Sequence, residues 1–187
     1  MSAPTPMLTE LTRIPGNDRL HIGGKSAAEG WKLLNIQPME GADYVGDIRD
    51  LSQFADASFD AVYGSHVLEH VGYQKALPEV IRSIHRILRP GGKFFVSVPD
   101  LDVLCRLFLD DQMTADDRFF VMRMMFGGQV DEHDFHYVGL NAELLAHFLQ
   151  KGGFQGIYRV PEFGIFGDTS SMKYHGVLIS LNMIAIK

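Results

Sequence analysis

Cysteine, long apolar runs and clusters of basic residues are all scarce in this chain of 187 residues. The single cysteine, Cys105, has no partner for an internal disulfide, which fits the reducing cytoplasm where we expect the protein to act. No apolar stretch reaches the roughly 18 uncharged residues of a membrane-spanning helix. The N-terminal segment also lacks the basic and apolar parts of a secretion signal. We therefore expect no membrane association.

Positive charge is not in surplus either. The formal net charge is −6, and the lysines and arginines do not cluster. A phosphate backbone is normally met by a concentrated basic surface, so we expect no nucleic-acid partner and a small molecule as the substrate. The length suits one core, and we expect residues 1–18 to form an N-terminal extension or lid and residues 19–187 to form a single domain.

Short apolar runs bounded by glycine or proline alternate with helical patterns along the chain. Apolar residues at three- and four-residue spacing predict a helix at 77–88, and Asn141 is placed to cap another helix that Gly152 ends. Further helices are expected at 101–108 and 119–125, and strands at 19–22, 32–36, 44–45, 59–63, 93–98, 155–160 and 177–186. This alternation predicts an α/β fold in which helices cover a mostly parallel sheet.

The segment between Gly24 and Trp31 is too short for an ordinary crossover between parallel strands, which needs roughly a dozen residues. We expect the first crossover helix to be truncated to a loop or a single turn.

Two glycine-containing turns are the first candidates for a ligand site. Ligands of open α/β sheets bind at the carboxyl ends of the strands, so the turns Gly23-Gly24 and Gly64-Ser65-His66 should flank the site. Glycine lets the backbone approach a ligand closely. The alternative is that these glycines only form tight turns.

An ordered series of motifs gives the site an identity. The motifs are Leu20 to Gly24, Gly46 to Leu51, Ser58 to Tyr63, Val67 to Val71 and Leu88 to Lys93. The series resembles the class I S-adenosylmethionine (SAM)-dependent methyltransferases, in particular a small type-11-like bacterial group associated with polysaccharide biosynthesis. The resemblance covers residues 19–98 and implies a Rossmann-like, seven-stranded, mostly parallel sheet with helices on both faces and an antiparallel last strand.

The resemblance also implies roles for individual residues. Gly23 and Gly24 would border the methionine part of SAM, Asp47 would accept a hydrogen bond from the adenine amino group, and Ile48 would lie against the adenine ring. Gly64, Ser65 and His66 would line the cofactor beside the methyl group. A turn or helix-cap role is the alternative for Asp47, and for Asp60 we favour a structural role.

Two residues depart from the family pattern. Lys25 follows the glycine turn, where its charge would repel a sulfonium unless it points away or meets the SAM carboxylate. Gln37 stands where the family supplies an acid for the ribose hydroxyls, although Glu40 offers a substitute. These departures support a rival hypothesis, a non-catalytic binding or assembly domain with a degenerate cofactor site. A dinucleotide-using enzyme is disfavoured, because no Gly-x-Gly-x-x-Gly run opens a helix.

The segment 131–136 combines two histidines with three acids. His133 and His136 are candidate general bases on a substrate-facing lid, together with His66, because histidine titrates near neutral pH. The two loop histidines also have the spacing of metal ligands, but no distant motif supplies the other ligands that zinc needs, so no metal site is expected. His70, which we expect on the first turn of a helix, is a further candidate base, with packing or helix capping as its alternative.

Phenylalanine and methionine are concentrated between Phe119 and Phe126. Helical spacing favours a place in the core for these side chains, and an adaptable subunit contact in a homodimer is the alternative.

Overall fold

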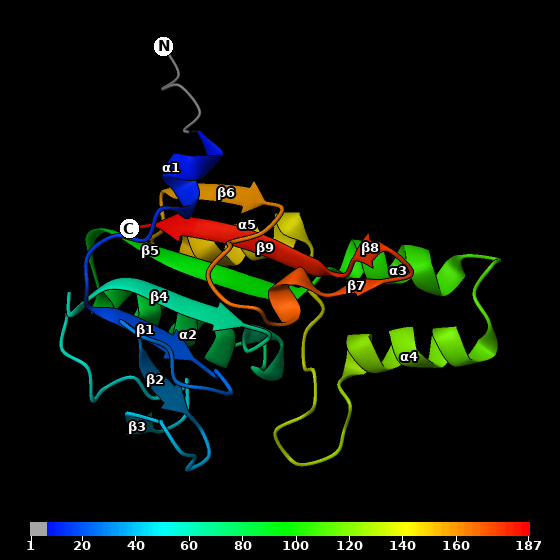
Figure 1. Ribbon diagram of the computed structural model, residues 1–187, viewed down its shortest axis with the longest axis horizontal. Coiled ribbons are helices and arrows are strands. Elements are labelled where there is room, and N and C mark those ends of the chain that lie inside the picture. The colour runs from blue at the N-terminus through cyan, green and yellow to red at the C-terminus, as the bar shows by residue number, and fades with distance from the viewer. Residues whose placement is uncertain (1–6) are drawn as a thin grey trace.

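The computed structural model describes residues 7–187, and a seven-stranded sheet is its central feature (Figure 1). The strand order is β3-β2-β1-β4-β5-β9-β6. β9 runs antiparallel to both of its neighbours, whereas the other paired strands are parallel. The predicted fold is therefore confirmed. The strands are β1 (Arg19–Ile22), β2 (Lys32–Asn35), β3 (Tyr44–Val45), β4 (Phe59–Ser65), β5 (Leu88–Pro99), β6 (Gly156–Val160) and β9 (Ser180–Ile186).

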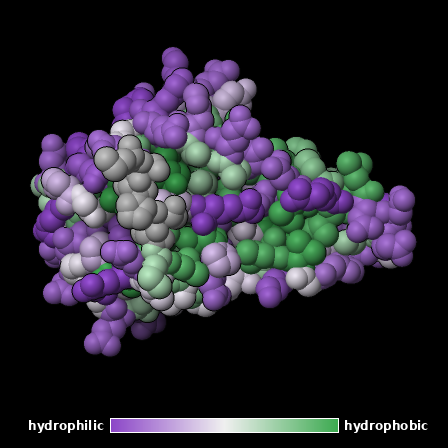
Figure 2. Space-filling view, turned by 90° about the horizontal axis from the view of Figure 1, so that it is seen from above, coloured by the Kyte–Doolittle hydropathy of each residue, from purple (hydrophilic) through white to green (hydrophobic). Residues whose placement is uncertain are grey.

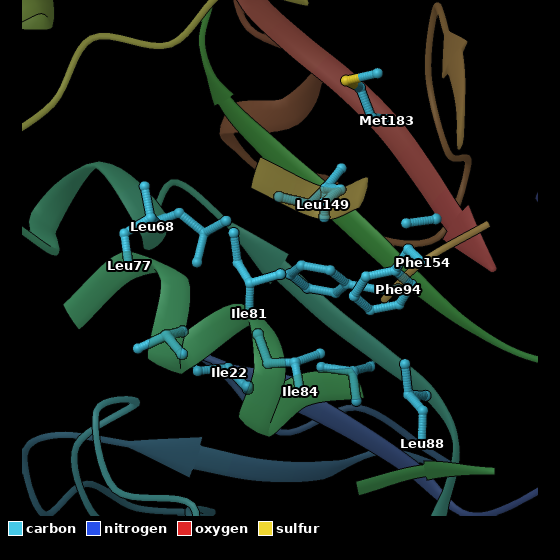
Figure 3. Packing of buried hydrophobic residues seen from close by; sticks show 14 of the residues in the cluster. Ile22, Leu68, Leu77, Ile81, Ile84, Leu88, Phe94, Leu149, Phe154 and Met183 are labelled. Carbon is cyan, nitrogen blue, oxygen red and sulfur yellow. The ribbon is translucent and has the colours of Figure 1, made fainter. Parts of the chain in front are cut away.

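One face of the sheet is covered by α2 (Ala76–Ile87) and α5 (Ala142–Lys151), which lie behind the sheet in Figure 1. The apolar stripe of α2 is buried as its spacing predicted, and Figure 3 shows Leu77, Ile81 and Ile84 packed together with Phe94 and Phe154. Asn141 caps α5 by accepting a hydrogen bond from the Leu144 backbone N–H (2.9 Å). This face carries the larger core.

The opposite face has much less helical cover. The five-residue helix α1 (Leu8–Thr12) buries Leu11 there, and the segment 161–171, which includes the 3₁₀ turn η2 (Thr169–Ser171), contributes Phe163 and Phe166. The predicted truncation of the first crossover is confirmed, since residues 23–31 contain no helix. Residues 1–6 of the expected N-terminal extension lie outside the described residues.

Helices α3 (Leu101–Leu109) and α4 (Ala115–Phe126) extend beyond the carboxyl ends of the strands, together with the hairpin β7 (Lys173–Tyr174) and β8 (Val177–Leu178) (Figure 1). Asp117 connects α4 to the hairpin, because it closes the capping box of α4 and accepts hydrogen bonds from Tyr174 (2.6 Å) and His175 (2.9 Å). Figure 2 shows hydrophobic side chains on the surface at this end of the molecule. No helix within residues 7–187 is long and apolar enough to cross a membrane.

The expectation that the Phe- and Met-rich cluster belongs to the core is wrong for Phe119 and Phe126, whereas the other members are half-buried and Met124 and Met125 pack against a small core. Val121 is the buried residue of α4, whereas Phe119 and Phe126 are 60% and 56% exposed. The helix projects past the sheet and packs on α3 and on Tyr174 of the β7–β8 hairpin, which leaves Phe119 and Phe126 exposed.

The buried His21 of β1 makes folding stability depend on pH. Its ring stacks on Phe166 with 4.2 Å between ring centres, and burial lowers the pKa of His21 from 6.5 to about 4. Between these two pKa values the unfolded chain binds more protons, so the free energy of unfolding falls as the pH drops through this window.

Between pH 7.5 and pH 5 the wild type should lose more stability than His21→Phe, and we predict a difference of about 2 kcal/mol in the free energy of unfolding. Urea denaturation of the wild type and the variant at both pH values measures this difference. The exposed His147 of α5 supplies the control, His147→Phe, which should lose as much stability as the wild type. An unchanged pH dependence in His21→Phe would contradict the assignment.

Candidate functional site

A cavity of about 230 Å³ opens at the carboxyl ends of β1 to β4. β2 and β3 lie on one side of β1 and β4 and β5 on the other, so the winding direction of the sheet reverses here. This is the position where open α/β sheets bind ligands. The lining residues are Ile22, Gly23, Leu34, Asn35, Ile36, Gly46, Asp47, Ile48, Arg49, His66, Val67, His70, Val71, Glu132, His133 and Tyr137.

The predicted site residues divide into two groups. Gly23, Asp47, Ile48, His66 and His133 line the cavity together, although they come from four separate segments. Another five do not line it, namely Gly24, Gln37, Gly64, Ser65 and His136.

Only the first glycine of the turn after β1 faces the cavity. Gly23 has a φ of +75°, and a Cβ at this position would lie 2.7 Å from Cγ2 of Val67. Gly24 is buried, and a Cβ there would lie 2.4 Å from Cε1 of the His21 ring. Gly24 is thus required by packing against His21 and not by an approach to the cavity.

At the end of β2 the side-chain amide of Asn35 replaces the expected polar group. Its Nδ2 donates to the carbonyl of Gly24 (2.9 Å), and its Oδ1 accepts from the backbone N–H of Gln37 (3.0 Å). Gln37 itself is exposed and away from the cavity, as are Glu40 and Lys25. Lys25, whose charge would repel a sulfonium, therefore does not line this cavity.

Asp47 is held by Arg49, a residue that the sequence analysis did not single out. Oδ1 of Asp47 accepts from the backbone N–H of Arg49 (2.8 Å), and Oδ2 accepts from Nε (2.8 Å) and from Nη2 of the same residue. These hydrogen bonds lower the pKa of Asp47. The carboxylate is therefore ionised and fixed at the cavity wall. Aspartate side chains commonly accept from the backbone N–H two residues further on, so the position of Arg49 two residues after Asp47 was the sequence signal for this turn.

The turn after β4 places His66 at the cavity and keeps its neighbours inside the protein. Gly64 is buried within the strand, and Ser65 has a buried hydroxyl for which no partner is found among residues 7–187. His66 has a φ of +54°, a left-handed conformation that is unusual for histidine. Asp60, at the start of the same strand, accepts from the backbone of Asn17 and Asp18 (both 3.1 Å), which gives it a structural role as predicted.

The His66 ring is held by one hydrogen bond to Ser180. Ser180 donates its hydroxyl proton to the carbonyl of Thr169 (2.8 Å), so it accepts from Nε2 of His66 (2.9 Å). Nδ1 of His66 then faces Oε1 of Glu69 at 3.4 Å. Burial lowers the pKa of His66 to about 3 and raises that of Glu69 to about 8, so both groups are neutral near pH 7.

Glu69 is a second residue that the sequence analysis left without a role. It lies with His70 in the 3₁₀ turn η1 (Leu68–His70), which corrects the expected placement of His70 on the first turn of a helix. Glu69 is 1% exposed, and neither of its carboxylate oxygens has a hydrogen-bond partner within the described residues. The sequence signal was its position between the apolar residues Leu68 and Val71, which are both buried in the structure, because acids are seldom buried.

The two loop histidines separate. His133 is exposed and lines the main cavity, and its backbone N–H donates to Oδ1 of Asp131 (2.8 Å). His136 turns away toward Glu69 and His70, with 4.7 Å between the ring centres of the two histidines. Tyr137 fastens this loop to η1, because its backbone N–H donates to the carbonyl of Glu69 (2.8 Å).

Part of the chain matches a known protein family. Residues 25–96 match the family model described as a methyltransferase domain, a segment that runs from the turn after β1 into β5. A search of curated proteins finds no match. The matched segment contains Asp47, Ile48 and His66.

Solved structures share the fold at low sequence identity. A protein of Bordetella parapertussis is 13% identical with a TM-score of 0.60, and the match covers 91% of this chain and 62% of that one. A SAM-dependent methyltransferase from Archaeoglobus fulgidus is 16% identical with a TM-score of 0.57, covering 93% and 88%. The 1,6-didemethyltoxoflavin-N1-methyltransferase of Burkholderia thailandensis, solved with bound 1,6-didemethyltoxoflavin and S-adenosylhomocysteine, is 17% identical with a TM-score of 0.54, covering 91% and 71%.

The chain spans less than two thirds of some of these structures, including 50% of the CurJ carbon methyltransferase. The chain shares its fold with SAM-dependent methyltransferases of known structure, and residues 25–96 match a methyltransferase domain.

We predict that Gly24→Ala destabilises the protein by about 1–3 kcal/mol, because the new methyl group must displace the buried ring of His21. Denaturant unfolding measures the loss. Gly72→Ala is the matched control, since a Cβ at Gly72 meets nothing within 4 Å, and it should change stability by less than about 0.5 kcal/mol. Equal effects of the two substitutions would show that His21 does not occupy this space.

Proposed function

We propose that the protein is a SAM-dependent methyltransferase that acts on a small molecule. The observation that carries the proposal is the cavity at the reversal point of the sheet, which gathers Gly23, Asp47, Ile48 and His66. The methyltransferase-domain match over residues 25–96 supports the same assignment.

The residues present fit this cofactor. Asp47 uses three of its roughly four acceptor positions on Arg49, which leaves one for the adenine amino group. Ile36, 39% exposed, and Ile48 offer apolar surface for a flat ring, and Gly23 leaves room for the methionine part. When bound, the cofactor supplies a methyl group activated by its sulfonium charge.

The chain's own contribution to methyl transfer would be alignment and exclusion of water. The loop that carries His133 and Tyr137 covers one side of the cavity, and its attachment to η1 holds it near the ligand. Orientation of an acceptor in a closed site supplies much of the acceleration of such a displacement. His133 is the proposed general base, because Nε2 of His66 is bonded to Ser180, its Nδ1 faces the buried Glu69, and His136 points to another cluster.

The proposed acceptor is a hydroxyl of a carbohydrate or glycan precursor, in polysaccharide biosynthesis in the cytoplasm. This part of the proposal rests on the resemblance of the motifs from Leu20 to Lys93 to the small type-11-like group. Asp47, Glu132 and Tyr137 add polar groups at the cavity wall that suit a hydroxyl-rich molecule.

The alternative is a non-catalytic domain that keeps the fold. Asn35 favours it, because at the end of β2 a neutral amide that is already hydrogen-bonded on both sides replaces an acid. Such a domain would bind SAM weakly or not at all.

Calorimetric titration with SAM and with S-adenosylhomocysteine distinguishes the two functions. We predict binding of both in the range of about 1 μM to 1 mM, and a loss of about 10- to 150-fold in Asp47→Ala, since a hydrogen bond to a carboxylate contributes about 1.5–3 kcal/mol.

Asp50→Ala is the matched control. Asp50 lies three positions further along the same turn, accepts a local hydrogen bond from Ser52 (3.0 Å) and does not line the cavity. Its substitution should leave the affinity unchanged. No binding of either ligand at millimolar concentration would favour the non-catalytic domain, and an unaltered affinity in Asp47→Ala would refute the proposed adenine contact.

The acceptor is tested by release of S-adenosylhomocysteine from SAM in the presence of sugars and sugar nucleotides. With an active hydroxyl acceptor, we predict that His133→Ala lowers kcat by about 10²-fold or more and leaves affinity for S-adenosylhomocysteine unchanged. An unchanged kcat would remove His133 from the mechanism.

A further inference from the structure

A cluster beside the main cavity is not explained by the proposed methyl transfer. Glu69 and His70 from η1 and His136 from the following loop each offer one ligand atom, and these atoms lie within 4.8 Å of one another. An ion with bonds of about 2.0–2.2 Å spaces its ligand atoms by up to about 4 Å, so a small side-chain movement closes the cluster around one.

The buried carboxylate of Glu69 is an independent sign that something is bound there. Both of its oxygens are buried without a hydrogen-bond partner among the described residues. An unpaired buried acid is costly, and buried acids are normally paired or bound to metals. A small cavity of about 10 Å³ touches Glu69 and His136, is otherwise lined mainly by apolar side chains such as Val98, and holds at most one water-sized particle.

His70 is oriented as a ligand would be. Its Nδ1 donates to the carbonyl of Phe135 (3.1 Å), which leaves Nε2 with its lone pair free to coordinate. A hydrogen bond from the second ring nitrogen to a backbone carbonyl is the usual way in which proteins orient metal-binding histidines.

The loop that brings His136 to the cluster is fixed at several points. The backbone N–H of His136 donates to the carbonyl of Phe126 (3.1 Å), and that of Tyr137 donates to the carbonyl of Glu69 (2.8 Å). Gly127 permits this path with a φ of +86°, where a Cβ would lie 2.2 Å from the carbonyl oxygen of Asp134.

We propose that Glu69, His70 and His136 bind one divalent first-row transition-metal ion. Two imidazoles and one carboxylate suit zinc, iron or cobalt better than magnesium or calcium, which prefer oxygen ligands. His70 also lines the main cavity, so open coordination positions of the ion would face the place where a small molecule binds. The ion site does not depend on SAM binding.

The test uses the full chain, stripped of metal with a chelator and titrated with Zn²⁺ or Co²⁺ in the absence of SAM. We expect one equivalent to bind per chain, a higher unfolding temperature with Zn²⁺, and visible Co²⁺ absorption bands. Absence of saturable binding at one equivalent would overturn the proposal.

Variants locate the ion. We expect His136→Ala and Glu69→Gln to lower Zn²⁺ affinity by at least about tenfold, whereas His147→Ala on α5 keeps the wild-type affinity. Wild-type affinity in both cluster variants, or an equal loss in the control, would overturn the assignment. Circular dichroism reports whether each variant folds, and His136→Ala, which removes a half-buried loop side chain, decides the matter if Glu69→Gln does not fold.

Titration of the same preparations with S-adenosylhomocysteine separates the two proposals. Zn²⁺ binding with no cofactor binding supports the ion site and counts against the methyltransferase, and the reverse result overturns the ion site alone.

Discussion

The sheet face opposite α2 and α5, which includes Tyr63, has to be covered without long helices, and much of the structure follows from this constraint. Tyr63 is fully buried, and its hydroxyl donates to Asp168 (2.8 Å) with Ser170 at 3.2 Å. A buried phenol needs such a partner, and here the segment 161–171 supplies it. Burial also raises the pKa of Tyr63, so its hydroxyl remains a proton donor. The same segment contributes Phe166, which stacks on His21, so that one loop covers the area left open where the first crossover is truncated.

This packing also shapes the cavity on the edge of the sheet. Because the His21 ring fills the space next to Gly24, the turn after β1 bends so that only Gly23 faces a ligand. The β2 end is tied to the same turn by Asn35, and the β3 end is fixed by the pair of Asp47 and Arg49. A cavity with several short, fastened walls is preorganised, which lowers the entropy lost when a ligand binds.

The sheet was predictable because its strands and α2 are signalled by local patterns, such as the spacing from Leu77 to Ile87. The motif residues Asp47 and Ile48 could be placed at strand ends for the same reason. The contacts of individual side chains could not be predicted, because they join residues that are far apart in sequence. Gly24 is explained only by the position of the His21 ring, and His136 meets Glu69 only because the loop after α4 returns to η1. The exposure of Phe119 had no local signal either, since α4 projects beyond the sheet.

Glu69 links the two halves of the site. Its carboxyl group lies between His66 and the pair formed by His70 and His136, while its backbone carbonyl accepts the N–H of Tyr137. Tyr137, His66 and His70 all line the main cavity. A change in the charge at Glu69 therefore acts on η1, which also positions the adjacent cavity-lining residue His70. A neutral Glu69 and an ion-bound Glu69 both avoid an isolated buried charge, but only a bound ion would draw His70 and His136 together. Occupancy of the proposed ion site would then act on the cavity wall through the short turn η1.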